Sequence, residues 1–374
     1  MTIDRRHFLL SCAAAPAFAR EHRCFSEIDV FQAGDAGYHT YRIPALLVTR
    51  KGTLLAFAEA RKDDGRDHGN IDLVVKRSED GGARWSEQAI VREEGGSAKI
   101  TIGNPCPIVD RRNGKILLPF CRDNNDVLVT ESADDGRSWS EPVTITQSVK
   151  KPAWTWYATG PGIGIQVERG RYRGRLVIPC DHREEIDGKW VKVSHVFFSD
   201  DGGRKWKLGG SAQKHTDECQ VAELSDGSLL LNMRNYWGSE GGEKDKGRKR
   251  AISRSRDGGA TWPDLWFDDT LIEPICQASL IRHDARGQGG KRALLFSNPA
   301  SRESRTQMKV RASFDDCKTW PVSRTVYEGP SAYSSLAALR DGSIGLLYER
   351  GVNRPYEKIT YARFTMNWLR GDEK

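Results

Sequence analysis

The stretch Ser78-Glu79-Asp80-Gly81-Gly82-Ala83-Arg84-Trp85 decides the fold, because its pattern Ser-x-Asp-x-Gly-x-x-Trp returns along the chain. Three more intact copies begin at Ser132, Ser199 and Ser255. A fifth copy, which begins at Ser313, has Cys317 in place of the glycine, and the five copies follow one another at intervals of 54 to 67 residues. Such a fixed period is typical of repeat proteins. We call this pattern the box.

The chemistry of the box predicts a tight turn. The Ser and Asp side chains are suited to bonding nearby backbone amides, the glycine allows a positive φ, and the tryptophan can bury its ring under a strand. Turns of this kind are common in β proteins, so the box by itself indicates structure and names no activity.

Short apolar runs that follow a turn recur six times and count the repeating units. They cover residues 52–61, 114–121, 174–180, 227–234, 292–298 and 342–349. Another apolar stretch precedes each run, starting near Tyr41, Asn104, Gly160, Glu218, Cys276 and Tyr333. In the first five units a third strand then leads into a box. We therefore predict an all-β fold, a six-bladed β-propeller with four-stranded antiparallel blades. The last unit ends near Trp368 without a box, so we expect residues 26–31 to supply its outer strand.

The first 19 residues have the features of an export leader. Arg5 and Arg6 precede an apolar, Ala-rich segment that ends in Ala17-Phe18-Ala19. A twin arginine followed by such a segment is typical of a Tat-type signal. We therefore predict a signal peptide over residues 1–19, and export of the protein to the periplasm or the medium.

A single propeller domain is expected over the remaining residues, 20–374. Lipid anchoring at Cys12 is an alternative, but Leu9, Leu10 and Ser11 match a lipidation motif only loosely. No run of 18 apolar residues occurs, so we expect no membrane span.

Charge and cysteine content exclude several classes of function. The formal net charge is +7, but the main basic run, Lys244 to Arg250, lacks interleaved aromatic residues and is typical of a solvated loop. Removal of the leader would leave an odd number of cysteines with no Cys-x-x-Cys spacing, which favours neither a metal site nor a full set of disulfides. We expect a monomer with no nucleic-acid partner, no metal and no cofactor.

Strand order places the unusual polar residues on one face of the ring. In an antiparallel blade the start of the first strand, the end of the second and the loop from the second to the third lie at the same face, which we call the mouth, and the boxes lie at the other. The residues expected at the mouth are Arg42, Glu59, Arg61, Asp67, Asn104, Arg122, Asp181, Glu218, Arg234, Gln277, Arg305, Tyr333 and Glu349. Charges are costly to desolvate without partners, so their convergence indicates a ligand site.

Arginines from different blades predict an anionic ligand. The forked guanidinium donors match a carboxylate in bidentate fashion, and sugars with a carboxylate at the anomeric carbon fit this requirement. A carboxylate nucleophile would be repelled by such a sugar. A tyrosine that a neighbouring glutamate deprotonates can attack without that penalty.

At these residues the chain resembles the exo-sialidase (neuraminidase) family of bacteria and animals, from Tyr41 to Phe364. The aromatic-Arg-Ile-Pro motif of that family matches Tyr41-Arg42-Ile43-Pro44. The resemblance implies that Arg42, Arg234 and Arg305 bind the substrate carboxylate, with Arg302 close enough to be an alternative to Arg305.

The resemblance also implies roles for other residues at the mouth. Tyr333 would be the nucleophile and Glu218 its base, while Glu349 would orient Arg42. Asn104 would lie near the N-acetyl pocket of the substrate and Arg61 beside the catalytic acid. The acid/base itself would be Asp67, with Asp63 and Asp64 as alternatives.

The activity implied is exo-hydrolysis of terminal α-linked sialic acids with retention, without a metal or a cofactor. Sialylated glycoproteins, gangliosides or oligosaccharides would be the substrates. Two alternatives stay open: a glycosidase or trans-glycosidase for a related 2-keto acidic sugar, and a non-catalytic propeller that binds sialic acid. Loss of the tyrosine, the glutamate or an arginine would indicate the non-catalytic protein, and none of them is missing.

Overall fold

Each box closes its turn with the same hydrogen bonds. In the first box the Oγ of Ser78 accepts from the N–H of Gly82 at 2.9 Å, and Oδ1 of Asp80 accepts from the N–H of Arg84 at 2.9 Å. The serine bond recurs in the other four boxes at 2.8 to 2.9 Å. Cys317 adopts a left-handed backbone with φ 65°, as the box glycines do, and its N–H still bonds Ser313. The fifth box is therefore a complete turn despite the substitution.

The computed structural model describes residues 24–283 and 292–372. The leader predicted for residues 1–19 lies outside these ranges. Within them, no helix has the length and apolar character needed to cross a membrane.

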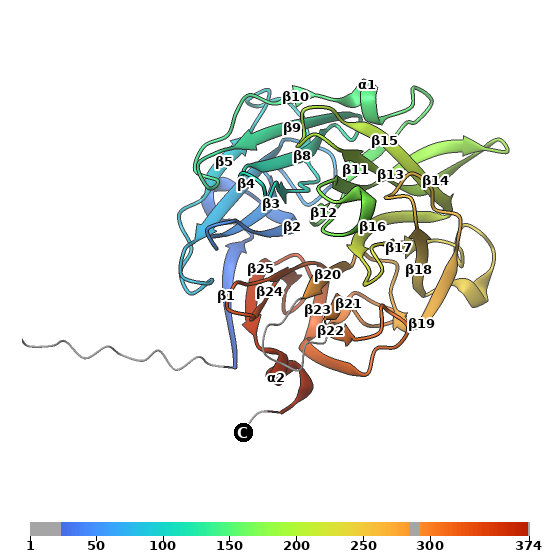
Figure 1. Ribbon diagram of the computed structural model, residues 1–374. Helices are drawn as coiled ribbons and strands as arrows, with labels where there is room; N and C mark the ends of the chain where they lie inside the picture. Colours follow the sequence, from blue (N-terminus) through green and yellow to red (C-terminus); the bar gives the residue numbers. More distant parts are fainter. Residues whose placement is uncertain (1–23, 284–291, 373–374) are drawn as a thin grey trace, which may run out of the picture.

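The sheets follow one another around a ring in chain order (Figure 1). Blade 1 contains β2 (Thr40–Val48), β3 (Leu54–Arg61), β4 (Ile71–Ser78) and β5 (Ala89–Arg92). Blade 2 contains β6 (Ile102–Gly103), β7 (Ile108–Val109), β8 (Ile116–Arg122), β9 (Asp126–Ser132) and β10 (Val143–Thr144). Blade 3 contains β11 (Tyr157–Thr159), β12 (Ile165–Gln166), β13 (Leu176–Ile186), β14 (Lys189–Ser199) and β15 (Lys207–Lys214). Blade 4 contains β16 (Thr216–Glu223), β17 (Leu229–Asn235), β18 (Lys249–Ser255) and β19 (Trp266–Ile272).

The remaining sheet has seven strands and divides into two blades within one long strand, β23 (Val322–Ala338). Its first half pairs with blade 5, which contains β20 (Ser279–His283), β21 (Ala293–Pro299) and β22 (Thr306–Ser313). Its second half pairs with blade 6, which contains β24 (Ile344–Arg350), β25 (Lys358–Phe364) and β1 (Phe25–Gln32). The described residues thus form six antiparallel units in a propeller arrangement, as the sequence predicts.

The N-terminal strand closes the ring. β1 lies antiparallel to β25, with Ile28 opposite Tyr361, and the two strands meet in Figure 1 where the blue and red ends of the chain come together. The outer strand that the sequence predicts for residues 26–31 is therefore present.

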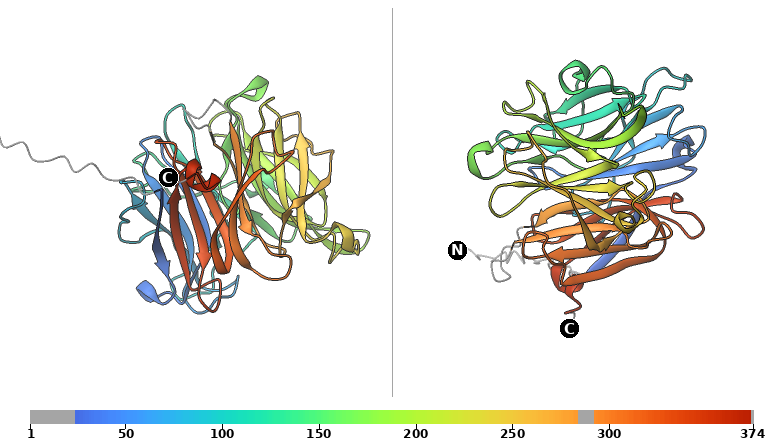
Figure 2. Two further views of the ribbon diagram at one scale, coloured as in Figure 1. Left: turned by 90° about the horizontal axis from the view of Figure 1, so that it is seen from below. Right: turned by 90° about the vertical axis from the view of Figure 1, so that its right-hand side faces the viewer.

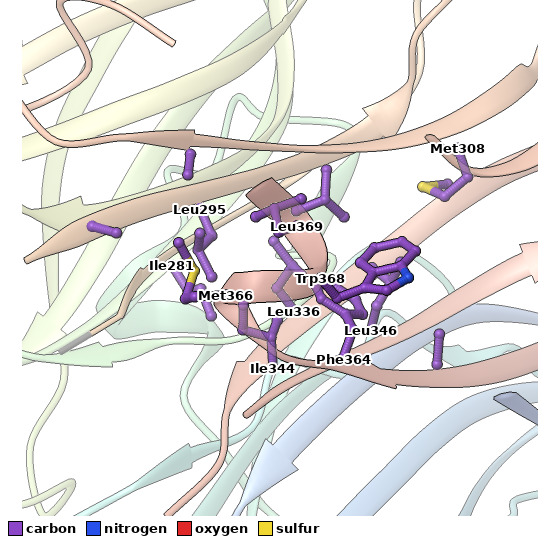
Figure 3. Close-up of a cluster of buried hydrophobic side chains, with 14 of the residues drawn as sticks. Ile281, Leu295, Met308, Leu336, Ile344, Leu346, Phe364, Met366, Trp368 and Leu369 are labelled. Atoms are coloured by element: carbon purple, nitrogen blue, oxygen red, sulfur yellow. The ribbon is translucent and has the colours of Figure 1, made fainter. Parts of the chain in front are cut away.

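The core is divided among the blades and the junctions between them. One cluster fills blades 5 and 6, where Met366, Trp368 and Leu369 of the short helix α2 (Met366–Arg370) pack with Leu295 and Leu336 (Figure 3). This helix lies at the rim of the ring, beside the blades that precede it in the chain (Figure 2). The only other α-helix in the described ranges, α1 (Thr146–Val149), links blades 2 and 3.

The boxes join neighbouring blades. The ring of Trp85 contacts that of Tyr361 in blade 6 at 5.4 Å between centroids, and the ring of Trp139 contacts that of Phe57 in blade 1 at 5.7 Å. Each of these boxes thus packs on the blade that precedes it around the ring.

Three inner strands differ from the prediction. Residues 104–107, which include Pro105 and Pro107, separate β6 from β7, and Pro161 interrupts the strand between β11 and β12. Proline has no N–H to donate to a ladder, so the inner strands of blades 2 and 3 are split. The inner strand of blade 5 begins at Ser279 rather than near Cys276.

Candidate active site

The two ends of the ring axis differ in chemistry. At the end away from the mouth, a cavity of about 380 Å³ is lined by inner-strand residues that include Leu46, Ala222 and Ala337. Charges there pair with one another, as Nη1 of Arg282 does with Oε2 of Glu223 at 3.3 Å. The mouth is where Arg42, Glu218 and Tyr333 meet, and we take it as the candidate site. Arg122, also expected there, pairs with Glu94 and Asp126 instead.

Glu349 connects the last blade to the first. Its carboxylate, at the end of β24, accepts a hydrogen bond from Nε of Arg42 at 2.8 Å and another from Nη2 at 3.3 Å. It also accepts from the backbone N–H of Ile43 and of Tyr333, each at 3.0 Å. Four bonds to one buried carboxylate fix the Arg42 guanidinium and the backbone of Tyr333 relative to each other.

Tyr333 and Glu218 form a direct pair. The phenol of Tyr333 donates to Oε1 of Glu218 at 2.5 Å. Nη1 of Arg234 donates to Oε2 of Glu218 at 2.7 Å and to the Tyr333 oxygen at 3.2 Å. The three side chains come from β23, β16 and β17, so the pairing depends on the approach of blades 4 and 6.

Arg305 also lies beside Tyr333. Its Nη1 donates to the hydroxyl of Tyr356 at 2.7 Å, and its Nη2 donates to the carbonyl of Ile275 at 3.4 Å. The guanidinium carbons of Arg42 and Arg305 lie 4.9 and 5.6 Å from the centroid of the Tyr333 ring. By contrast, Arg302 is exposed and donates to the carbonyl of Arg248. The structure therefore brings Arg305, and not Arg302, to the other two arginines.

Asp67 projects over this group from the loop between β3 and β4. Its side chain is 66% exposed, and its Oδ1 lies 2.9 Å from Nη1 of Arg61 and 3.6 Å from Nη1 of Arg42. Partial desolvation opposes ionisation, but the charges of Arg61 and Arg42 outweigh it and lower the pKa of the Asp67 carboxyl.

The alternative acid Asp64 points to a different partner. It accepts from the backbone N–H and the Nε of Arg66 at 2.8 and 2.7 Å, and these bonds lower its pKa to about 2. Within the part of the chain that the structure describes, Asp64 has no hydrogen bond or ion pair with an arginine of the mouth. Of the two residues, Asp67 is the one that lies beside Arg42.

Arg61 and Asn104 are linked through Glu59. Arg61 is buried and donates Nη2 to Oε2 of Glu59 at 2.7 Å, and its Nη1 also holds the carbonyl of Gly65 in the Asp67 loop. The other oxygen of Glu59 accepts from the backbone N–H of Asn104 at 2.9 Å. Glu59 therefore links two segments: the loop that carries Asp67 in blade 1, through Arg61, and the segment between β6 and β7 in blade 2, through Asn104.

Some of the residues with left-handed backbone in the described ranges lie around this group. Ile43, Asn104, Ile275 and Gln307 all have positive φ, between 55° and 61°. Side-chain-bearing residues, and β-branched ones above all, rarely adopt this conformation, and such strain clusters at functional sites. Ile43 follows Arg42, and Gln307 lies two residues after Arg305. Asn104 bonds Glu59, and Ile275 bonds Arg305.

Burial shifts the ionisation of the central pair. Burial raises the pKa of Glu218, and the charge of Arg234 opposes that effect only in part. Burial, reinforced by the charge of Glu218, raises the pKa of Tyr333 well above its ordinary value. The phenol is therefore protonated at rest, with its proton directed at the carboxylate that can accept it.

The sequence did not identify several residues of the mouth. Tyr356, in the loop after β24, stacks on Arg42 with 4.1 Å from the guanidinium carbon to the ring centroid. Asp217 and Trp156 were not predicted either; they lie beside Asp181, which the sequence does predict at the mouth and which is buried and accepts from Nε1 of Trp156 at 3.0 Å. Burial and the charges of Asp217 and Glu218 raise the pKa of Asp181 well above its ordinary value. No motif accompanies Tyr356 or Trp156, so only the fold could place them.

Within the described ranges, no three His, Cys, Asp or Glu side chains lie close enough together to hold a metal ion.

The fold and the mouth together define a class, that of β-propellers built from box-containing repeats. A family model described as a BNR repeat-like domain matches residues 52–346. The chain is 31% identical to an exo-alpha-sialidase of Aspergillus fumigatus, over 89% of this chain and 86% of that protein. It is also 35% identical to a sialidase of Micromonospora viridifaciens, over 96% of this chain but only 56% of that longer protein.

Among solved structures, the Hadza microbial sialidase Hz136 superposes with a TM-score of 0.81 at 32% identity, over 92% of this chain and 69% of that one. The chain therefore belongs to the sialidase family.

Proposed function

We propose that the protein is an exo-α-sialidase, which removes terminal α-linked sialic acids from glycoproteins, gangliosides or oligosaccharides with retention of configuration. The observation that carries the proposal is the arrangement of three guanidiniums around one tyrosine. Arg42 and Arg234 are paired with Glu349 and Glu218, whereas within the described ranges Arg305 forms no ion pair with a carboxylate. A buried or half-buried cation without a counter-ion favours an anionic ligand, and a sugar carboxylate fits the forked donors.

Formation of a glycosyl-enzyme is the first proposed step. The Tyr333 oxygen attacks the anomeric carbon while its proton passes to Glu218, which is already hydrogen-bonded to it. A phenol needs such a base at neutral pH, and it does not repel the substrate carboxylate as an aspartate or glutamate would. The three arginines stabilise the flattened, oxocarbenium-like state by holding that carboxylate.

Asp67 is proposed to act on the leaving group and then on water. It protonates the departing sugar and afterwards removes a proton from the water that releases sialic acid. The lowered pKa of Asp67 in the unliganded protein comes from Arg61 and Arg42. A substrate carboxylate on Arg42 would neutralise part of that charge and make protonation of Asp67 easier.

The test is hydrolysis of a fluorogenic sialoside, run beside glycosides of other 2-keto acidic sugars. We expect the sialoside to be the best substrate and Tyr333→Phe to lose nearly all activity. Tyr348→Phe is the matched control, because its hydroxyl faces Glu27 on β1 rather than the mouth. Faster turnover of another acidic sugar, or full activity of Tyr333→Phe, would overturn the proposal.

Stereochemistry is tested separately, by following an activated sialoside with proton NMR. Retention requires that the α-anomer of the free sugar appear first, before it equilibrates. Early appearance of the β-anomer would contradict a glycosyl-enzyme on Tyr333.

Export by the Tat route is also proposed, on the leader alone. Arg5 and Arg6 stand before the apolar segment, as such signals require. Replacement of both by lysine should retain the protein inside the cell. Unchanged export of that variant would contradict the assignment.

A further inference from the structure

The backbone that carries Tyr333 is not held by regular strand pairing. The register of β23 against β24 shifts between Ser331 and Ser334, so Ala332 and Tyr333 lie in an irregularity of the ladder. The N–H of Tyr333 is satisfied by Glu349 instead of by a strand partner. Side chains therefore position the nucleophile proposed above, and the register with β24 resumes at the next residue, Ser334, opposite Tyr348.

Gln277 binds the backbone of Ser334 from the side of the ring axis, opposite to the strand of Tyr348, through both of its amide atoms. Its Oε1 accepts from the N–H of Ser334 at 2.9 Å, and its Nε2 donates to the carbonyl of Ser334 at 3.0 Å. Both bonds are buried, and Gln277 is only 1% exposed. One side-chain amide thus holds the whole backbone unit of the residue that follows Tyr333, at a site where water cannot replace either bond.

The same amide reaches the strand of the base. Nε2 of Gln277 also donates to the carbonyl of Pro161 at 3.1 Å, and that carbonyl accepts a second bond, at 3.1 Å, from Nε2 of Gln220. Gln220 lies on β16, two residues after Glu218. The two amides therefore share the Pro161 carbonyl, and of the two only Gln277 also binds the backbone beside Tyr333.

Gln277 is itself held firmly. The segment before it has a left-handed residue, Ile275, with φ 57°. The carbonyl of Cys276 accepts from Nη1 of Arg250 at 2.7 Å, and Arg250 is buried in an ion pair with Glu273. Strained backbone that is fixed by a buried ion pair is typical of a segment whose exact position matters to function.

We propose that Gln277 is a positioning residue that keeps the Tyr333 phenol at hydrogen-bonding distance from Glu218 by clamping Ser334. The inference rests on the proposed role of Tyr333 as the nucleophile. It predicts a loss in the chemical step without a loss in substrate binding, because the arginines have other supports: Glu349 holds Arg42, and Tyr356 holds Arg305.

The test compares Gln277→Met with Gln220→Met. Both substitutions remove one bond to Pro161, but only the first removes the clamp on Ser334. A shift of about 1 Å in a reacting group costs on the order of 100-fold in rate, so we expect kcat for an aryl sialoside to fall about 10- to 100-fold in Gln277→Met. The affinity for a sialic-acid-like carboxylate inhibitor should stay within about threefold of wild type in both variants, and so should kcat in Gln220→Met.

A mechanism-based fluorinated sialosyl fluoride separates this inference from the proposed function. Wild-type protein should be labelled at Tyr333, and Gln277→Met should be labelled there more slowly by the same factor as its kcat. Absence of labelling in the wild type would overturn both proposals. Labelling of wild type and Gln277→Met at equal rates, or an equal loss of kcat in Gln220→Met, would overturn the role of Gln277 alone.

Gln277→Glu provides a second variant in case the methionine variant does not fold. Because the new carboxyl would be buried against the carbonyls of Ser334 and Pro161, it should be protonated: it keeps the acceptor for the N–H of Ser334 and can donate to only one of the two carbonyls. We expect kcat to fall less than in Gln277→Met, again with unchanged inhibitor affinity. Wild-type kcat in this variant, or a parallel loss of affinity and kcat, would contradict the proposal.

Discussion

The phenol oxygen of Tyr333 lies 2.5 Å from Oε1 of Glu218, although 115 positions separate the two residues in the chain. They belong to blades 6 and 4, so the distance between them is set by the closure of the ring rather than by either blade. A short bond of this kind aligns the proton before any substrate arrives.

Replacement of Glu218 by glutamine should remove the base and keep its shape. An amide can still bond the phenol but cannot take its proton, so we expect kcat to fall by about 10²- to 10⁴-fold. Steady-state kinetics with an aryl sialoside measures this loss. Glu27→Gln, which changes a carboxylate on the outer strand β1, should keep wild-type activity, and an active Glu218→Gln enzyme would exclude this base.

The pH dependence should reveal the raised pKa of Glu218. The base works only when ionised, so activity should decline as the pH falls through a pKa above the ordinary glutamate value of 4.5. An activated aryl sialoside is the substrate of choice, because its leaving group needs little help from Asp67. If the acidic limb of the pH profile of kcat/KM had its midpoint at or below pH 4.5, burial would not raise the pKa of Glu218.

Asp67→Asn should discriminate between substrates by their leaving groups. Without the acid, sialosides with sugar leaving groups should lose about 10²- to 10⁴-fold in kcat, whereas activated aryl sialosides should lose far less in the first step. Asp64→Asn is the control, since Asp64 bonds Arg66. If Asp64→Asn showed the selective loss instead, the assignment of the acid within this loop would be wrong.

Arg305 should contribute to carboxylate binding and Arg302 should not. Hydrogen bonds to charged groups contribute about 1.5 to 3 kcal/mol, and Arg305→Ala should weaken a carboxylate inhibitor by that amount. Titration calorimetry measures the change directly. Arg302→Ala removes an exposed arginine that bonds a carbonyl, so its affinity should be that of the wild type. The opposite pattern would exchange the two assignments.

Gly82→Ala should test how tightly the first box packs on the last blade. A Cβ at Gly82 would lie 2.0 Å from Cε1 of Tyr361, whereas a Cβ at Gly34 would meet no atom within 4 Å. The two glycines have φ values of 92° and 91°, so both substitutions carry the same backbone cost of about 1–2 kcal/mol. Overpacking should add about 1–3 kcal/mol at Gly82 alone, as measured by urea unfolding. Equal losses would show that Tyr361 moves aside without cost.

The fold was predictable because its repeat is encoded locally. Ser78, Asp80 and Gly82 specify their turn through contacts within a few residues, and the same contacts recur in every copy. The closing strand could be inferred from the missing outer strand of the last blade. The splits at Pro105 and Pro161 were not inferred, since each depends on how a proline fits the crowded centre of the ring.

The roles of the site residues were predictable only where a motif surrounds the residue, whereas strand order alone placed others, such as Asp181, at the mouth. Arg42 lies in such a motif, and the resemblance also placed Tyr333 and Glu218. Tyr356 and Gln277 act through partners more than 50 positions away, Arg305 and Ser334, and nothing in their local sequence reports those partners. Asp181 was expected at the mouth, but its neighbour Asp217 and the resulting shift in pKa depend on burial that only the folded ring creates.

The carboxylate of Glu349 makes the site depend on a closed ring. It bonds the backbone of Ile43, which lies 306 positions earlier, and thereby joins the first blade to the last. Synthesis delivers Arg42 with the first blade and Glu349 with the last, so the pocket for the sugar acid forms only after the last blade has been made. In each molecule, cleavage of a sialoside would then show that translation had reached the last blade and that the first and last blades had joined.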